Sequence, residues 1–211
     1  MTTTAQAAAP SLAAAAEEPQ VYDQRVPTWP IRVASLIIGF LWFTQLQWKL
    51  PWDHFGSPGL QPNPTPSAEQ PGPFIDKGAG LYHWITVEVQ NGNKIVPFYG
   101  DLLKNLALPN WELVGWMTFF LESTIMLLLL LGLLTRLGGF LGLMQGVNLF
   151  LGLSQAPNEW YWTYGMLMTL QLIFMFTGAG RVWGLDARLR PWLRARIAAG
   201  EGWAGRLYRL T

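Results

Sequence analysis

The sequence predicts an all-α integral membrane protein whose core is a bundle of four transmembrane helices. The composition is the first observation, because 51% of the residues are hydrophobic and only 13% are charged, whereas a soluble domain carries about 25% charged residues. The second is the presence of 12 tryptophans, which fit aromatic belts at two membrane surfaces. The third is a set of four apolar runs, each about as long as the hydrocarbon core of a bilayer is thick.

The chain begins with an Ala/Thr/Pro-rich stretch, and residues 1–28 are predicted to be a disordered cytoplasmic tail. This stretch lacks the basic n-region and the leucine-rich core of a signal peptide. It also has too little apolar surface to fold. The transmembrane domain is expected over residues 29–186. Its predicted spans are residues 31–50, 111–134, 137–154 and 160–177.

The distribution of basic residues predicts the orientation of these spans. The ten arginines fall on one side of the membrane and the four lysines on the other. The short turns agree, since Arg136 lies between the second and third spans and Glu159 lies between the third and fourth. The positive-inside rule then places both termini in the cytoplasm. The chain is therefore expected to be a multi-pass protein of the cytoplasmic (inner) membrane.

The segment between the first two spans, residues 51–110, is predicted to be external and is too long for a plain loop. Apolar and polar residues alternate from 84 to 90, and Asn91-Gly92 follows directly. An Asn-Gly pair after such an alternation is typical of a β-hairpin. A short helix capped by Asp101 is expected next.

Residues 187–211 are predicted to form a basic amphipathic tail with a C-terminal helix. Leu189, Trp192, Leu193 and Ile197 are set among arginines there. Such a helix is expected to lie on the anionic cytoplasmic leaflet. The predicted partner of the tail is the lipid bilayer, and nucleic acid is not an expected partner.

Glu122 is the most informative residue of the apolar runs, because a carboxylate near mid-bilayer costs about 3 kcal/mol. Gln45 lies at a similar depth, and Lys49 is one turn further out, so an ion pair between Lys49 and Glu122 is geometrically possible. In a functional interpretation the carboxyl exchanges a proton with a ligand such as a quinone. In a structural interpretation Glu122 only joins helices, partnered by a polar side chain. The candidate partners are Lys49, Gln45, Gln145 and Asn148.

Glycines of the third predicted span recur at four-residue spacing, at Gly138, Gly142 and Gly146. Small residues at this spacing predict close helix packing, either within the chain or with another subunit. Several cofactor classes are excluded by composition. The chain has no cysteine and only two histidines, both outside the apolar runs. Neither an iron–sulfur cluster, nor a haem held by two histidines in the bilayer, nor another metal is expected from its own residues.

Three motifs in order resemble the DoxX/DoxD family over residues 30–190. The first predicted span ends in Trp48-Lys49 and a proline. The second contains Glu122 and leads into Gly132-Leu133-Leu134-Thr135-Arg136. The fourth opens with Glu159-Trp160-Tyr161-Trp162 and leads into Gly178-Ala179-Gly180-Arg181 and then Gly184-Leu185-Asp186.

The resemblance implies a four-helix membrane bundle that works with other membrane subunits. In the DoxD branch it implies the membrane subunit of a thiosulfate:quinone oxidoreductase, which passes electrons from thiosulfate to quinone beside a smaller partner subunit. In the DoxX branch it implies a membrane component of oxidoreductase or stress-defence assemblies.

We therefore expect a subunit of a quinone-linked electron-transfer complex. Glu122 and Lys49 are the candidate catalytic residues. The candidates for binding the quinone, or for completing a polar network, are Gln45, Trp48, Gln145 and Asn148. The alternative is a non-catalytic subunit that packs at the edge of a respiratory or photosynthetic complex through its glycine stripe and aromatic faces.

Overall fold

The computed structural model describes residues 27–46, 49, 80–157 and 159–211, and this part of the chain is helical, without strands. The all-α prediction is thereby confirmed for these residues. The elements are α1 (Trp29–Leu46), α2 (Gly80–Gly92), α3 (Tyr99–Leu102), the π-helical turn η4 (Leu103–Ala107), α4 (Trp111–Leu131), α5 (Thr135–Leu153), α6 (Tyr161–Thr177), the 3₁₀ turn η5 (Ala179–Arg181), α7 (Asp186–Ala198) and α8 (Gly202–Arg209).

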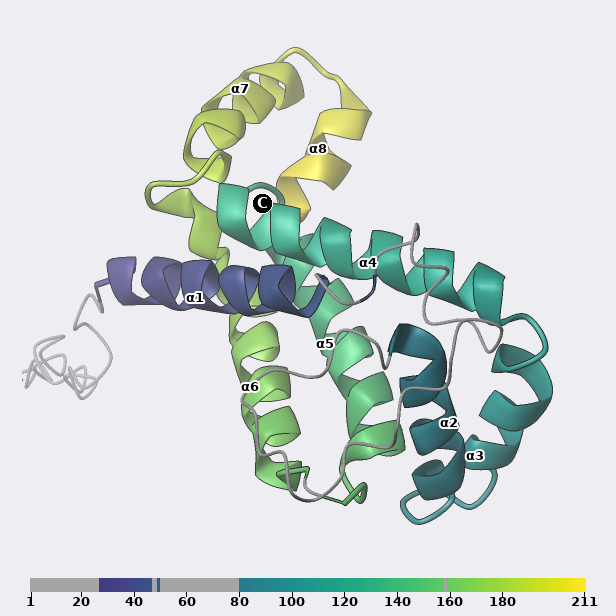
Figure 1. Cartoon of the computed structure of the whole chain (residues 1–211). Coiled ribbons are helices and arrows are strands. Elements are labelled where there is room, and N and C mark those ends of the chain that lie inside the picture. The colour runs from purple at the N-terminus through teal and green to yellow at the C-terminus, as the bar shows by residue number, and fades with distance from the viewer. Residues whose placement is uncertain (1–26, 47–48, 50–79, 158) are drawn as a thin grey trace, which may run out of the picture.

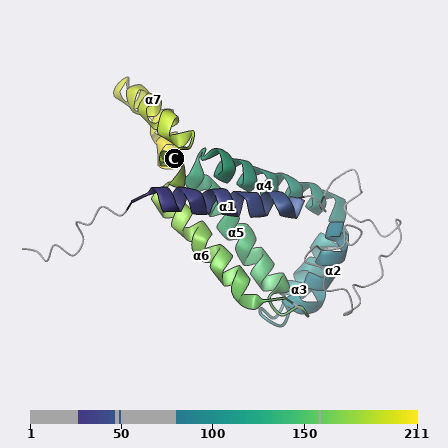
Figure 2. The ribbon, with the colours of Figure 1, turned by 60° about the vertical axis from the view of Figure 1, so that its left-hand side comes forward.

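The helices form two pairs arranged as a V. Helix α1 packs along α4, and α5 packs along α6 (Figure 1). The pairs meet where α4 turns into α5 and diverge toward the other end, where α2 packs against α5 (Figure 2). Arg136 contacts the last turn of α6, and Glu159 precedes its first turn, so the two residues lie at opposite ends of the α5–α6 hairpin. The core between the pairs centres on Trp42, Ile125, Leu129 and Phe174.

The glycines of α5 allow this helix to approach two neighbouring helices. A Cβ on Gly139 would lie 2.5 Å from the backbone nitrogen of Met175, and one on Gly142 would lie 2.3 Å from the side-chain amide carbon of Gln171. Gly146 faces Met168 of the same helix, α6. Gly138 instead faces Leu128 of α4, at 3.0 Å. The glycines thus pack against α6 and α4 of the same chain.

Helices α1 and α4 are the two described helices that are long and apolar enough to cross a membrane, with mean hydropathies of 1.3 and 1.9. Only 33% of the apolar stretch of α1 and 22% of that of α4 are buried, whereas the core helix of a soluble protein is mostly buried. Large side chains such as Phe40 and Phe120 are more than half exposed. Helix α6 has only 17 residues, and α5 carries several polar side chains. That these two helices also cross the bilayer therefore stays a prediction.

The prediction of a β-hairpin after residue 84 is wrong, because α2 occupies this segment. Leu81 and Ile85 are one helical turn apart and are buried against Ala107 of η4. This shared apolar face stabilises the helix against the β-propensity of the alternating residues. Asn91-Gly92 lies at the end of α2 instead of in a hairpin turn, and the Asn91 carbonyl accepts a hydrogen bond from the Lys94 nitrogen.

The remaining predicted segments differ in smaller ways. The expected short helix is present as α3 and η4, but it begins at Tyr99 without a side-chain cap, and Asp101 lies inside it. The basic tail forms two packed helices, α7 and α8, where one was expected. Most of the predicted N-terminal tail, residues 1–26, lies outside the described residues, and so does Trp48.

Candidate functional site

A large cavity lies between the two arms of the V. Its volume is about 1400 Å³, and α1, α2, α4, α5 and α6 all contribute to its wall. Most of the wall is apolar, and several wall residues are also exposed on the outside of the protein: Leu41, Leu113, Trp116, Met117, Phe120 and Met166. A few polar side chains interrupt this apolar surface. Such a lining suits a lipophilic ligand with a polar head.

The centre of the polar group is an ion pair between Lys49 and Glu122. The Lys49 Nζ lies 2.6 Å and 2.7 Å from the two carboxylate oxygens of Glu122. Glu122 is 0% exposed and Lys49 is 4% exposed. Gln145 of α5 donates a third hydrogen bond to the carboxylate, at 2.9 Å. One carboxylate therefore links Lys49, three residues after α1, to the middle of α4 and the middle of α5.

The other predicted site residues are only partly brought to this carboxylate. Gln45 lines the same cavity. Asn148 also lines it, but its side-chain oxygen accepts a hydrogen bond of 2.6 Å from the Tyr99 hydroxyl. Trp48 cannot be assigned a place, because it lies outside the described residues.

Glu88 is a second buried carboxyl in the cavity wall, and it is not among the site residues predicted from the sequence. It is 7% exposed. Its side chain lies against Gly152 of α5, where a Cβ would come within 2.6 Å of the Glu88 Cγ. Burial, together with the charge of Glu122, raises the pKa of Glu88 from 4.5 to about 8, against the opposing effect of Lys49. The incorrect hairpin prediction hid this residue, whereas a helical reading places it one turn from Ile85.

Two further polar groups belong to the same wall. At the wide end of the V, the Tyr164 hydroxyl donates a hydrogen bond of 2.7 Å to Glu159. Trp42 is 3% exposed, and its indole nitrogen has no acceptor among the described residues. Within the described ranges, no three His, Asp or Glu side chains are close enough together to hold a metal ion.

A separate group of polar residues, here named the apex cluster, lies where the arms of the V meet. It consists of Asp186, Thr135, Leu134 and Gly180. Asp186 is 0% exposed and accepts hydrogen bonds from the Leu134 and Thr135 nitrogens, at 2.7 Å and 3.0 Å, and from the Thr135 hydroxyl, at 2.9 Å. The Gly180 nitrogen donates to the same hydroxyl at 3.1 Å. The cluster therefore fastens η5 and the start of α7 to the turn between α4 and α5.

Residues around the apex cluster complete this junction. Gly132 has a φ of 62°, and a Cβ there would lie 2.7 Å from the Gly184 Cα. Arg32 of α1 donates to the carbonyls of Leu129 and Leu130 at 2.6 Å and 2.7 Å. The Gly-Leu-x-Thr-Arg and Gly-Ala-Gly-Arg…Leu-Asp motifs thus come together in space, where they hold helix ends.

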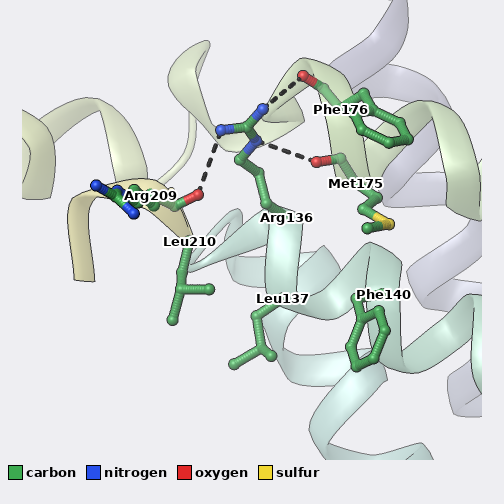
Figure 3. A pocket seen from close by; sticks show the side chains of 7 residues that line it. All are labelled: Arg136, Leu137, Phe140, Met175, Phe176, Arg209 and Leu210. Atoms are coloured by element: carbon green, nitrogen blue, oxygen red, sulfur yellow. Dashed lines mark hydrogen bonds between the residues drawn. The ribbon is translucent and has the colours of Figure 1, made fainter. Parts of the chain in front are cut away.

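A smaller pocket of about 250 Å³ adjoins Arg136 (Figure 3). The Arg136 guanidinium donates hydrogen bonds to the carbonyls of Met175, Phe176 and Arg209, at 3.0, 3.1 and 3.3 Å. The guanidinium is thus hydrogen-bonded to three main-chain oxygens, and it joins the end of α6 to α8.

Comparison with known proteins gives one match. Residues 84–199 match the profile of a family described as "TQO small subunit DoxD". No curated protein and no solved structure matches the chain. The matched region contains Glu88, Glu122, Gln145 and the apex cluster, whereas Lys49 precedes it.

Proposed function

Because the chain belongs to the DoxD family, we propose that it is the membrane subunit of a quinone-linked electron-transfer complex and that quinone binds in the cavity of the V. The family and the apolar helices indicate a membrane protein. The proposed complex is of the thiosulfate:quinone oxidoreductase kind, in which a partner subunit supplies the electrons. The observation that carries the quinone site is the buried Lys49–Glu122 ion pair at the wall of a large apolar cavity.

The chemistry of the cavity suits a quinone in two respects. The apolar wall accommodates a ring and a prenyl chain, while Lys49, Gln145 and the Trp42 indole offer donors for carbonyl oxygens. Charged groups in a dry, apolar setting also interact with developing negative charge more strongly than the same groups in water. A quinone that is being reduced develops this kind of charge on its oxygens.

The proposed topology has four spans, with α5 and α6 crossing beside α1 and α4. Both termini and the α7–α8 hairpin are placed on the cytoplasmic side, and α2 and α3 on the outer side. The arginines of α7 and α8 and the exposed Trp192 and Trp203 suit the surface of an anionic leaflet. The partner subunits would contact the exposed apolar faces of the V.

The alternative of a purely structural subunit receives less support. It relied on the glycine stripe and the aromatic faces as surfaces for another subunit, and the aromatic faces of the described helices are exposed. Gly142 and Gly146 face α6, and Gly138 faces α4. These glycines are covered within the chain. The structural alternative also assigns no role to the cavity.

The test is photolabelling of the full chain in lipid nanodiscs with an azidoquinone, competed by decylubiquinone. We expect label on peptides of α1 and α4 that line the cavity. Leu121→Trp, which fills the cavity beside the ion pair, is expected to reduce labelling by about tenfold, since it removes the contact volume. Leu127→Trp is the matched control, because Leu127 lies on the exposed face of α4, outside the cavity wall.

Two results would count against this function. Equal labelling of the Leu121→Trp and Leu127→Trp proteins would exclude the cavity as the quinone site. Unchanged quinone-linked turnover of a correctly assembled Glu122→Gln protein would remove the catalytic role of that carboxylate and leave it a structural one.

A further inference from the structure

The charges at the cavity do not balance if every carboxyl group in it is ionised. Glu88 and Glu122 are both buried in its wall, and Lys49 is the cation that the described lining residues supply. Lys49 contacts both oxygens of Glu122, and Gln145 donates to the same carboxylate. The single positive charge of Lys49 is thereby matched by Glu122, so an ionised Glu88 would add an uncompensated charge to an apolar cavity.

The surroundings of Glu88 favour its neutral form. No described residue donates a hydrogen bond to its carboxyl group, in contrast to the three bonds that Glu122 accepts. The titratable or charged groups that act on it are Lys49, Glu122, Tyr99 and Tyr164. The facing residues of α5 are uncharged, Gly152 and Leu153 among them, and Lys104 of η4 is exposed.

We propose that Glu88 is the group that holds a proton in the cavity at neutral pH and delivers it to the quinone, while the Lys49–Glu122 pair stays ionised and orients the ligand. This inference rests on the proposed function. In the transfer, the O–H bond of Glu88 breaks and an O–H bond forms on a quinone oxygen, as the partner subunit's electron donor is oxidised and supplies two electrons. The Glu88 carboxylate then takes a proton from external water, and a second transfer completes the quinol.

We place the entry of the proton that Glu88 regains at the wide end of the V. Glu159 is partly exposed there, lines the same cavity and accepts the hydrogen bond of Tyr164. The charge of Glu88 acts on Tyr164. Water that reaches Glu159 is therefore the proposed source of the proton.

Infrared spectroscopy of the full chain in nanodiscs tests the proton without quinone. We expect a carbonyl band of a protonated carboxyl group at neutral pH that disappears as the pH rises. The band should be absent from Glu88→Gln and present in Glu112→Gln, the matched control, because Glu112 is an exposed carboxylate on α4. A band that persists in Glu88→Gln would overturn the proposal.

Quinone reduction by the assembled complex tests the transfer. Glu88→Gln should bind decylubiquinone as wild type does but reduce it roughly 100-fold more slowly, since a proton donor is lost. Glu88→Asp should restore part of the rate with a shifted pH profile, which a packing role alone would not produce. A wild-type rate and pH profile in Glu88→Gln would overturn this inference and leave the quinone site intact. If the wild-type protein itself did not bind decylubiquinone, both the quinone site and the role of Glu88 would be overturned.

Discussion

The buried polar groups at the apex of the V and in its cavity differ in what satisfies them. In the apex cluster, the Asp186 carboxylate is bonded chiefly to backbone nitrogens at helix ends. In the cavity wall, the Glu122 carboxylate is bonded to the side chains of Lys49 and Gln145. Backbone donors cannot be removed by substitution, whereas side-chain partners can. The first arrangement therefore suits a fixed junction and the second a site that binds and reacts.

The largest expected effect is at the apex. Asp186→Ala removes three hydrogen bonds and leaves the Leu134 and Thr135 nitrogens buried without acceptors, so we expect a loss of roughly 4 kcal/mol in unfolding free energy. Thermal unfolding in detergent measures it. Adding Thr135→Val should give no recovery, because the backbone donors stay unpaired. A double variant as stable as the wild type would show that the junction depends on side chains after all.

A smaller effect, and one that can be reversed, is expected at the ion pair. Lys49→Met leaves the Glu122 charge buried without its cation and should lower stability by roughly 3 kcal/mol. The double variant Lys49→Met/Glu122→Gln should recover most of that loss in the same unfolding assay while its azidoquinone labelling stays weak. If the double variant were no more stable than Lys49→Met, the apex cluster and the ion pair in the cavity would not differ as described.

The last expected effect varies with pH, and it is the dependence of stability on pH that Glu88 contributes. Its pKa is raised from 4.5 to about 8 in the folded protein, so between these values the folded state binds more protons than the unfolded state. Stability should therefore be greatest below the unfolded pKa and decrease as the pH rises through about 8. Unfolding temperatures of wild type and Glu88→Gln, compared across this window, measure the contribution. Parallel curves for the two proteins would contradict it.

The sequence predicted the elements whose physical signal is local. Apolar runs predict helices such as α1 and α4 because hydropathy is a property of each run by itself. The ion-pair geometry was also within reach, since Glu122 is out of place in an apolar run and Lys49 lies at a similar depth. The roles of Gln45, Gln145 and Asn148 depend on packing and could not be separated in advance.

Two features required contacts that the sequence does not display. The alternation after Trp84 favours a strand, and only the burial of Leu81 and Ile85 against η4 decides for a helix. With that decision, Glu88 moves from an external hairpin into the cavity. The motif around Thr135 marked the family, but its function in joining helix ends appeared only once Asp186 was placed beside it.

The exposed apolar residues in the cavity wall, such as Phe120 and Met166, have a consequence for how occupancy should be measured. In the proposed topology, a ligand that reaches these residues arrives from the acyl chains and not from the aqueous phase. The concentration that matters is then the mole fraction of the ligand in the bilayer. Transfer of a hydrophobic ligand from water into the bilayer is favoured by about 0.8 kcal/mol for each buried methylene. Short-tailed and long-tailed ligands of equal intrinsic affinity would then saturate the protein at very different total amounts.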